Sequence, residues 1–340
     1  MLEGSRILIT GGTGSFGTAF VRHALDHLDP GELVIFSRDE FKQHQMAQQW
    51  STADYPIRYF LGDIRDKQRL LRAFNGVDYV VHAAALKHVP ALEDNPFEAV
   101  QTNVIGAQNI VEAALERNVK RVVAISTDKA VSPINLYGAT KLCMEKLLVA
   151  ANAYVRYRDI RFAVVRYGNV VGSRGSVIPL FAGLMSEGCR ELPVTDPQMT
   201  RFWITLDQGV ELVINALENA RSGETFVPKI PSMRMSDLVA AMPEQCTYRV
   251  VGKRPGEKVH EVLISHSEGT RAYDRGSYYA ITPECGAAEA PEGCPVPPGF
   301  TYESQDNTEW VSEDEMRAMI RRFSDERSGP PQGRAGRRRG

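Results

Sequence analysis

A glycine-rich turn near the N-terminus most constrains what this chain can fold into. The turn follows the apolar run Arg6–Thr10 and precedes an amphipathic stretch, Ser15–Asp26. Between a strand and a helix, glycines at this spacing permit a tight turn and a close approach to a pyrophosphate, which the helix N-terminus attracts. The pattern therefore predicts a dinucleotide site formed by Gly11, Thr13, Gly14, Ser15, Phe16 and Gly17.

Short β-branched runs alternate with helix-like stretches through the first half of the chain. The predicted strands are Arg6–Thr10, Leu33–Ser37, Ile57–Leu61, Tyr79–Ala83, Arg121–Ser126 and Arg161–Tyr167. The predicted helices include Ser15–Asp26, Pro96–Glu116 and Tyr137–Tyr157. Because the strands are too apolar to have one face in water, they indicate a parallel sheet covered by helices on both faces. We therefore predict an α/β chain with a doubly wound Rossmann sheet.

The length of 340 residues exceeds one comfortable hydrophobic core. We expect a dinucleotide-binding domain over residues 1–168 and a mainly substrate-binding region over 169–323, with some segments returning to the Rossmann core. The stretch 282–299 is dense in Pro, Gly and Ala and predicts an irregular loop. Residues 324–340 are rich in Arg, Gly and Pro and predict a disordered basic tail.

The overall charge excludes several classes of partner. The 42 acidic and 40 basic side chains give a net charge of −2, so nothing favours nucleic acid or an anionic membrane. No apolar run approaches the length of a membrane span, and the five scattered cysteines lack the spacing of a zinc site. We expect a cytoplasmic protein without a metal site.

Residues after the second, third and fourth strands complete the predicted cofactor site. Ser37 and Arg38 supply a hydroxyl and a guanidinium suited to a 2′-phosphate, which favours NADP, whereas Asp39 and Glu40 leave NAD open. The other candidates are Asp63, which either binds the adenine amino group or caps the next helix, Ile64 beside it, and the small residues Ala83 and Ala84, which either let the cofactor pass or simply pack.

A second constellation carries the chemistry. Tyr137 and Lys141 are four residues apart in a predicted helix, so they share one face, where the ammonium would lower the tyrosine pKa and reach the nicotinamide ribose. Such a tyrosine deprotonates an alcohol as its hydride leaves. Asp128 and Lys129 just upstream add an acid and a base that plain oxidation does not need. This surplus indicates a dehydratase.

The ordered motifs resemble the extended short-chain dehydrogenase/reductase superfamily, and within it the inverting UDP-N-acetylglucosamine 4,6-dehydratases that begin pseudaminic acid biosynthesis. The resemblance covers about Arg6 to Leu263. It is carried by the glycine-rich turn, Ser-Arg-Asp-Glu from Ser37, His-Ala-Ala-Ala-Leu-Lys-His from His82, Ser-Thr-Asp-Lys-Ala from Ser126, Asn-Leu-Tyr-Gly-Ala-Thr-Lys from Asn135, Arg-Tyr-Gly-Asn-Val from Arg166, Ser-Arg-Gly-Ser from Ser173, Met-Thr-Arg-Phe-Trp from Met199 and Arg-Pro-Gly-Glu-Lys from Arg254.

The resemblance implies UDP-N-acetylglucosamine as substrate, NADP as cofactor and a role for each catalytic residue. Tyr137 would take the 4-hydroxyl proton, with Thr127 orienting a sugar hydroxyl. Lys129 would remove the proton at position 5, and Asp128 would protonate the departing 6-hydroxyl. We expect Lys141 and partial burial to lower the Lys129 pKa, since only a neutral amine is a base.

The resemblance also implies the remaining substrate contacts and the assembly. Its substrate candidates are Lys87, near both cofactor and sugar, Asn169 on a phosphate or sugar hydroxyl, Arg174, Arg201 and Arg254 on the diphosphate, and Glu257 on a ribose or sugar hydroxyl. We expect a homo-oligomer, either a dimer or a hexamer.

Three other functions stay open from the sequence. A nucleotide-sugar 4-epimerase or simple dehydrogenase would need Tyr137 and Lys141 but gives no role to Asp128 and Lys129. A retaining 4,6-dehydratase would carry Thr-Asp-Glu where this chain has Thr127-Asp128-Lys129. A non-catalytic NADP-binding scaffold would not need the tyrosine and lysine that this chain has.

Overall fold

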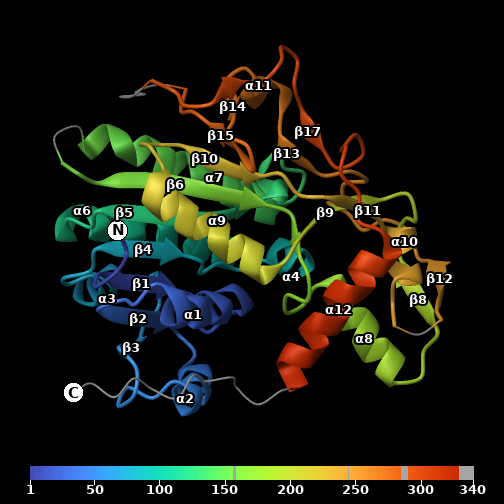
Figure 1. Cartoon of the computed structure of the whole chain (residues 1–340), viewed down its shortest axis with the longest axis horizontal. Helices are drawn as coiled ribbons and strands as arrows, with labels where there is room; N and C mark the ends of the chain where they lie inside the picture. The colour runs from blue at the N-terminus through green and yellow to red at the C-terminus, as the bar shows by residue number, and fades with distance from the viewer. Residues whose placement is uncertain (156–157, 244, 285–289, 329–340) are drawn as a thin grey trace.

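A large sheet with a parallel centre organises the protein (Figure 1). This computed structural model describes residues 1–155, 158–243, 245–284 and 290–328, and within them seven strands run parallel in the order β3-β2-β1-β4-β5-β6-β10. Their bounds are β1 Arg6–Thr10, β2 Glu32–Ser37, β3 Ile57–Leu61, β4 Tyr79–His82, β5 Arg121–Thr127, β6 Arg161–Tyr167 and β10 Thr225–Pro228. The predicted doubly wound fold is confirmed.

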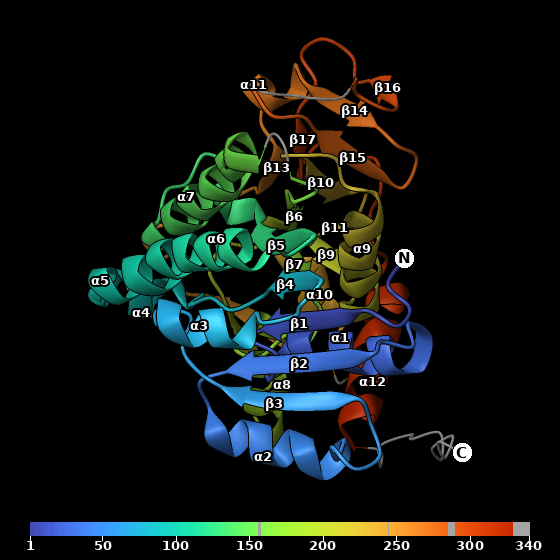
Figure 2. The same cartoon turned by 90° about the vertical axis from the view of Figure 1, so that its left-hand side faces the viewer.

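Helices cover both faces of the sheet (Figure 2). One face carries α1 (Ser15–His27) and α9 (Leu206–Asn219), and the other carries α3 (Lys67–Ala73), α6 (Gly106–Arg117) and α7 (Leu136–Ala151). Along β1, Ile9 packs with the α1 and α9 side, whereas Leu8 packs with the α3 and α6 side, and both are fully buried. Burial on both faces explains why the predicted strands are continuously apolar.

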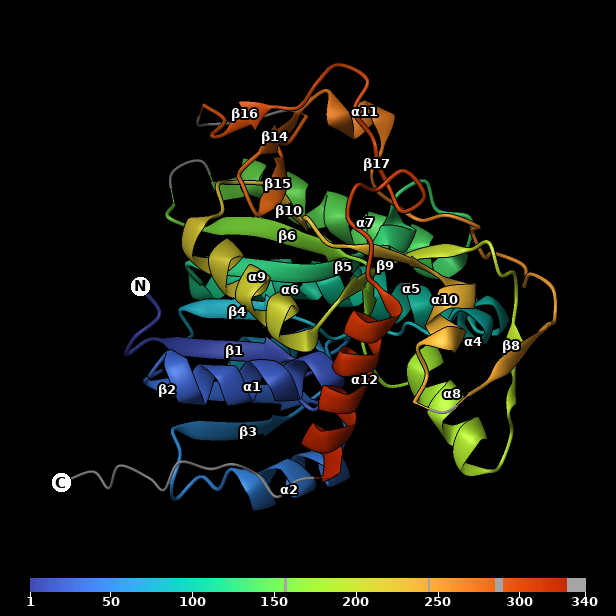
Figure 3. The same cartoon turned by 45° about the vertical axis from the view of Figure 1, so that its right-hand side comes forward.

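Segments beyond residue 168 extend the sheet and add a smaller region at the carboxyl ends of the parallel strands (Figure 3). The antiparallel strands β15 (Tyr278–Ile281), β14 (Ala272–Asp274) and β16 (Cys294–Pro295) follow β10, with α11 (His266–Gly269) nearby. The smaller region contains the pairings β11-β9-β7, β12-β8 and β13-β17, formed by β7 Asn169–Val170, β8 Glu191–Val194, β9 Thr200–Ile204, β11 Ser232–Arg234, β12 Thr247–Val250, β13 Val262–Ile264 and β17 Tyr302–Glu303. Its helices are α8 Val177–Ser186, α10 Met235–Ala240 and α12 Glu313–Ser328.

The prediction of one regular helix over Pro96–Glu116 is wrong, because a π-helical turn interrupts it. The structure has α4 (Val89–Asp94), then α5 (Pro96–Val100), a π-helical turn over Gln101–Ile105, and α6. A π-helical turn widens the backbone locally and re-aims the side chains on it. Here it carries the buried Asn103, whose amide bonds both the N–H and the carbonyl of Leu86 at 2.9 Å. The π turn thus anchors the loop after β4.

Three other sequence-based boundaries need correction. α7 ends at Ala151 rather than Tyr157, since Asn152 accepts the N–H of Phe162 and donates to carbonyls of the last turn; Tyr157 lies outside the described residues. The stretch 282–299 contains β16, and its residues 285–289 are not described. α12 extends to Ser328, so the first five residues of the expected tail are helical, and 329–340 are not described.

Candidate active site

The glycine-rich turn has the shape that an anionic cofactor requires. Gly11 has φ +67°, and a Cβ on it would lie 2.9 Å from the Cα of Ala84. Gly14 is the N-cap of α1, and no described side chain caps the first N–H groups of the helix. The first N–H groups of α1 therefore point into the site and can bind a pyrophosphate.

The carboxyl end of β2 presents a cation rather than a carboxylate. The Asp39 side chain accepts the N–H of Lys42 at 3.0 Å and pairs with its ammonium at 2.7 Å, so it caps α2 (Glu40–Gln49). Arg38 is half-exposed and lies 3.9 Å from Asp63, and the Ser37 hydroxyl accepts from Gln43 at 3.0 Å. The Asp39 carboxylate is therefore engaged with α2, whereas the Arg38 guanidinium is partly open to solvent.

The remaining cofactor candidates lie in different surroundings. Both oxygens of Asp63 accept from Arg65, and Asp66 rather than Asp63 caps α3, so the helix-cap alternative for Asp63 is wrong. The Ile64 side chain is buried in the core. Ala84, together with Ala83 before it, stays close to the turn because its N–H donates to Thr10.

The acid and base candidates lie in a short 3-10 turn, Asp128–Ala130, directly after β5. Asp128 is fully buried, and its Oδ1 accepts from the Thr127 hydroxyl at 2.8 Å and from the Lys129 ammonium at 3.1 Å. Its Oδ2 has no hydrogen-bond partner among the described residues. A buried carboxylate with an open oxygen costs stability, which is typical of a group that awaits a ligand.

Tyr137 and Lys141 come from the first turns of α7, but they do not interact as predicted. The Lys141 ammonium donates to the Ile125 carbonyl at 2.6 Å, and burial lowers its pKa to about 8. Burial raises the pKa of Tyr137 to about 12, although the charge of Lys129 and a hydrogen bond with Thr127 act to lower it. The expectation that Lys141 lowers the tyrosine pKa is wrong, because Lys129 is the cation that acts on the phenol.

The expected downward shift of the Lys129 pKa is also wrong. Burial does act to lower it, but the carboxylates of Asp128 and Glu261 outweigh burial and raise the pKa well above its ordinary value. Glu261 is almost completely buried, and its Oε1 lies 3.2 Å from the Lys129 ammonium. Sequence reasoning missed Glu261; its only signal is its place three residues after the Lys258 that ends the last motif.

The predicted substrate residues fall into separate groups. Asn169 lies on β7, opposite Trp203 of β9. Arg174 reaches the cofactor side, where its guanidinium donates to the Thr13 carbonyl at 3.1 Å and its N–H to the Ser15 hydroxyl. Lys87 lies near both Arg174 and Lys129, and burial together with these two charges lowers its pKa. Lys87 and Arg174 therefore make the space between the turn and Lys129 positive.

Of the two remaining arginine candidates, Arg201 is buried and Arg254 is exposed. Arg201 is buried, and its guanidinium donates to the carbonyls of Lys258 and Val259 at 3.0 Å each, so it holds the segment before Glu261 instead of lying open to a diphosphate. Arg254 is exposed at a turn in which Glu257 accepts the Arg254 N–H at 3.1 Å.

The turn over 254–257 is connected to the catalytic helix, because the Asn135 side chain that caps α7 also donates to the Gly256 carbonyl at 2.9 Å. Lys258, which follows that turn, donates to the Val131 carbonyl at 2.5 Å. Both contacts fasten the substrate candidates to the residues around the catalytic turn. The described residues contain no cluster of three or more His, Cys, Asp or Glu that could hold a metal.

Comparisons with known proteins identify the family. The polysaccharide biosynthesis protein family matches residues 7–283. The chain belongs to this family. It is 47% identical over 330 residues to the UDP-N-acetylglucosamine 4,6-dehydratase (inverting) of Campylobacter jejuni, covering 94% of this chain and 98% of that protein. A UDP-glucose 4-epimerase of Rickettsia canadensis is 43% identical over 288 residues, 83% of this chain and 84% of that protein.

Two solved structures share the fold of this chain. Pen from Bacillus thuringiensis superposes with a TM-score of 0.88 at 38% identity, covering 95% of this chain and 99% of that chain. DesIV, a dTDP-glucose 4,6-dehydratase from Streptomyces venezuelae solved with NAD, has a TM-score of 0.65 at 26% identity, with coverages of 75% and 86%. The described part of this family member has no helix long and apolar enough to cross a membrane.

The approach of α7 to the catalytic turn generates a prediction. A Cβ on Gly138 would lie 2.0 Å from the Lys129 carbonyl oxygen, so Gly138→Ala must push α7 and Lys129 apart. We expect a loss of about 1–3 kcal/mol in the free energy of unfolding, measured by denaturant titration, and a large loss of turnover. Gly183→Ala in α8 is the matched control, because its added Cβ would meet no described atom within 4 Å apart from its chain neighbours and its own helix backbone; it should gain up to about 1 kcal/mol. Equal stability of the two variants would contradict this contact.

Proposed function

We propose that this chain removes water from UDP-N-acetylglucosamine across positions 4 to 6 and inverts position 5. The product is UDP-2-acetamido-2,6-dideoxy-β-L-arabino-4-hexulose. The observation that carries the proposal is Lys129, an amine where retaining dehydratases have a carboxylate, seated between buried carboxylates beside Tyr137. The 47% identity to a protein named as the inverting enzyme supports the same substrate and outcome.

A nicotinamide dinucleotide is the proposed cofactor, since it supplies reversible hydride transfer at positions 4 and 6. The turn that contains Gly11 and Gly14 would hold its pyrophosphate at the start of α1, with the Arg174 charge close by. NADP is favoured over NAD, because the Asp39 carboxylate caps α2 while Arg38 is half-exposed beside Ser37. The NAD in DesIV belongs to a more distant relative.

The residues of the chain would each move or hold a proton. The Lys129 charge favours the phenolate form of Tyr137, and this phenolate accepts the proton of the 4-hydroxyl as the hydride leaves. The 4-ketone acidifies the proton at position 5, which Lys129 removes in its neutral form. Asp128 protonates the leaving 6-hydroxyl with the proton that it takes from the Lys129 ammonium across their 3.1 Å hydrogen bond, and the same transfer leaves Lys129 neutral. Proton return to the opposite face of position 5 completes the inversion.

We also propose a cytoplasmic homo-oligomer whose product enters pseudaminic acid biosynthesis. Phe97 of α5 is 83% exposed, and Tyr154, just after α7, is 76% exposed. Phe97, on a helix that packs against α7, is the exposed apolar side chain at which we place the subunit contact.

The function is tested by proton NMR of UDP-N-acetylglucosamine incubated with the protein and NADP in deuterated water. We expect a new 6-deoxy methyl signal, deuterium at position 5 and L-arabino couplings. Retained D-xylo couplings would overturn the inversion, and a galacto sugar without a methyl would indicate a 4-epimerase, the activity named for the Rickettsia relative. An unchanged sugar with bound NADP would favour the non-catalytic scaffold.

Two substitutions separate the half-reactions. Lys129→Ala should still bind cofactor and oxidise position 4, more slowly because Tyr137 loses its cation, whereas water release and position-5 exchange should fall by at least about 100-fold because the base is gone. Tyr137→Phe should also stop the oxidation. Reduced-nicotinamide absorbance and deuterium at position 5 report the two steps. Unaltered turnover of Lys129→Ala would remove Lys129 from the mechanism.

The cofactor preference generates its own prediction. Arg38→Ala should weaken NADP binding by about 1.5–3 kcal/mol, since a charge-assisted contact to the 2′-phosphate is lost. Calorimetric titration with NADP measures this change, and NAD, which lacks that phosphate, is the internal control. Equal weakening of both cofactors would contradict the assignment of Arg38.

A further inference from the structure

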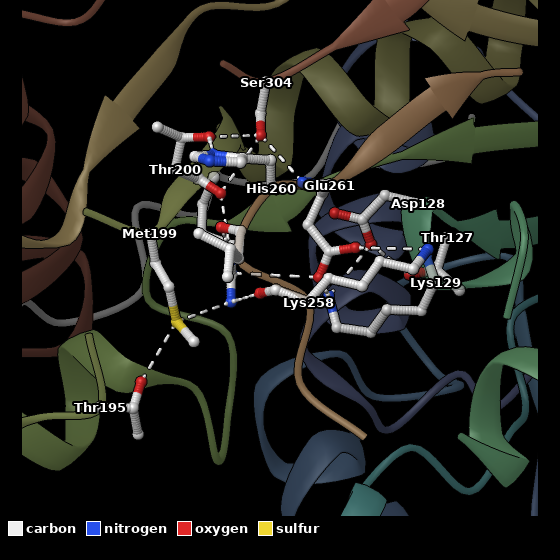
Figure 4. Close-up of polar contacts among 12 residues, drawn as sticks. Thr127, Asp128, Lys129, Thr195, Met199, Thr200, Lys258, His260, Glu261 and Ser304 are labelled. Atoms are coloured by element: carbon white, nitrogen blue, oxygen red, sulfur yellow. Dashed lines mark hydrogen bonds and ion pairs between the residues drawn. The ribbon is translucent and has the colours of Figure 1, made fainter. Parts of the chain in front are cut away.

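The amine of Lys129 contacts two carboxylates, and the proposed mechanism gives a role to only one of them, Asp128. Asp128 Oδ1 lies 3.1 Å from its Nζ, and Glu261 Oε1 lies 3.2 Å away, from the segment that leads into β13 (Figure 4). Glu261 is 2% exposed, and its Oε2 has no hydrogen-bond partner among the described residues. The proposed steps give this buried carboxylate no role.

The geometry of an amine shows what two such contacts do. A neutral lysine has two N–H bonds and one lone pair in a tetrahedral arrangement. When one N–H bonds to Asp128 and the other to Glu261, the lone pair can point only along the one tetrahedral direction that is left. With Asp128 alone, the amine could rotate about its Cε–Nζ bond, and the lone pair would then have no fixed direction.

We propose that Glu261 is a positioning residue that fixes the second N–H of Lys129, so that its lone pair faces position 5 of the bound sugar. This inference rests on the proposed function. It assigns Glu261 no contact with the sugar and no proton transfer of its own.

Glu261 is itself held firmly enough to position another group. Its backbone N–H donates to the Ser304 hydroxyl at 2.9 Å, and its carbonyl accepts the Ser304 N–H at 2.9 Å. Thr200 contacts the same hydroxyl at 2.6 Å (Figure 4). Arg201 donates to the two carbonyls just before His260. The backbone of Glu261 is therefore fixed, and it holds the start of the side chain beside Lys129.

The surrounding charges give the proposal a measurable signature. The charged and titratable groups that act on Lys129 or contact Glu261 are Asp128, Tyr137, Arg201, Lys258 and Lys87. Only the carboxylates favour the ammonium form of Lys129; the nearby cations oppose it. The acidic limb of position-5 exchange, where rate rises as Lys129 loses its proton, should therefore move to lower pH when the Glu261 charge is removed.

The test measures deuterium exchange at position 5 against pH with the cofactor-loaded enzyme. Glu261→Gln removes the charge and keeps an acceptor, so we expect the acidic limb to shift down by about 1 pH unit or more with most of the plateau rate retained. Glu261→Asp keeps the charge and withdraws the acceptor, so we expect an unshifted limb and a plateau roughly 10- to 100-fold lower.

The control is Glu224→Gln, which removes an equally buried carboxylate from Arg275 in another part of the molecule and should lower thermal stability without changing the limb or the plateau. Two outcomes would overturn the inference. In one, both Glu261 variants lose the same plateau rate and neither shifts the acidic limb; in the other, neither variant changes the pH profile of position-5 exchange. Absence of any methyl product from the unaltered protein would instead overturn the proposed function.

Discussion

The contact between the start of α7 and the turn after β5 is the constraint on which the candidate site depends. The Gly138 backbone reaches the Lys129 carbonyl so closely that no Cβ fits between them. Asn135 caps the helix at this point and bonds to the 254–257 turn. Tyr137, Lys129 and the substrate turn are therefore placed by one junction, and a small shift there would separate all three.

The junction concentrates charge around two carboxylates that are almost completely buried. Lys129, Asp128 and Glu261 lie beside one another, and a second buried group joins Arg166 to Glu145 of α7 and Glu268 of α11. Removing such groups from water is costly unless their hydrogen bonds are made. The Arg166 group is fully bonded and fastens α7 to β6. The Lys129 group leaves two carboxylate oxygens open, as expected where a ligand completes the set.

Much of the fold could be predicted because local sequence determines it. Strands such as Arg6–Thr10 and Arg161–Tyr167 are buried on both faces, so their apolar runs mark their bounds directly. The π turn could not be predicted, because its cause is the bonding of Asn103 to Leu86 in another segment. The same limit applies to function. The motif that contains Arg201 showed a basic residue but not its carbonyl partners, and the Lys129 pKa depends on Glu261, which is distant in sequence.

The hydrogen bonds of Ser304 bear on how the enzyme is made. Every motif that marks the chemistry precedes residue 259, yet the segment that carries Glu261 is fixed by a residue more than forty positions later. During synthesis, the Rossmann strands and the catalytic turn emerge long before the strand that completes their surroundings. A growing chain that already carries the whole set of motifs thus still lacks the finished site, and the order of translation delays chemistry until the segment around Ser304 has been made.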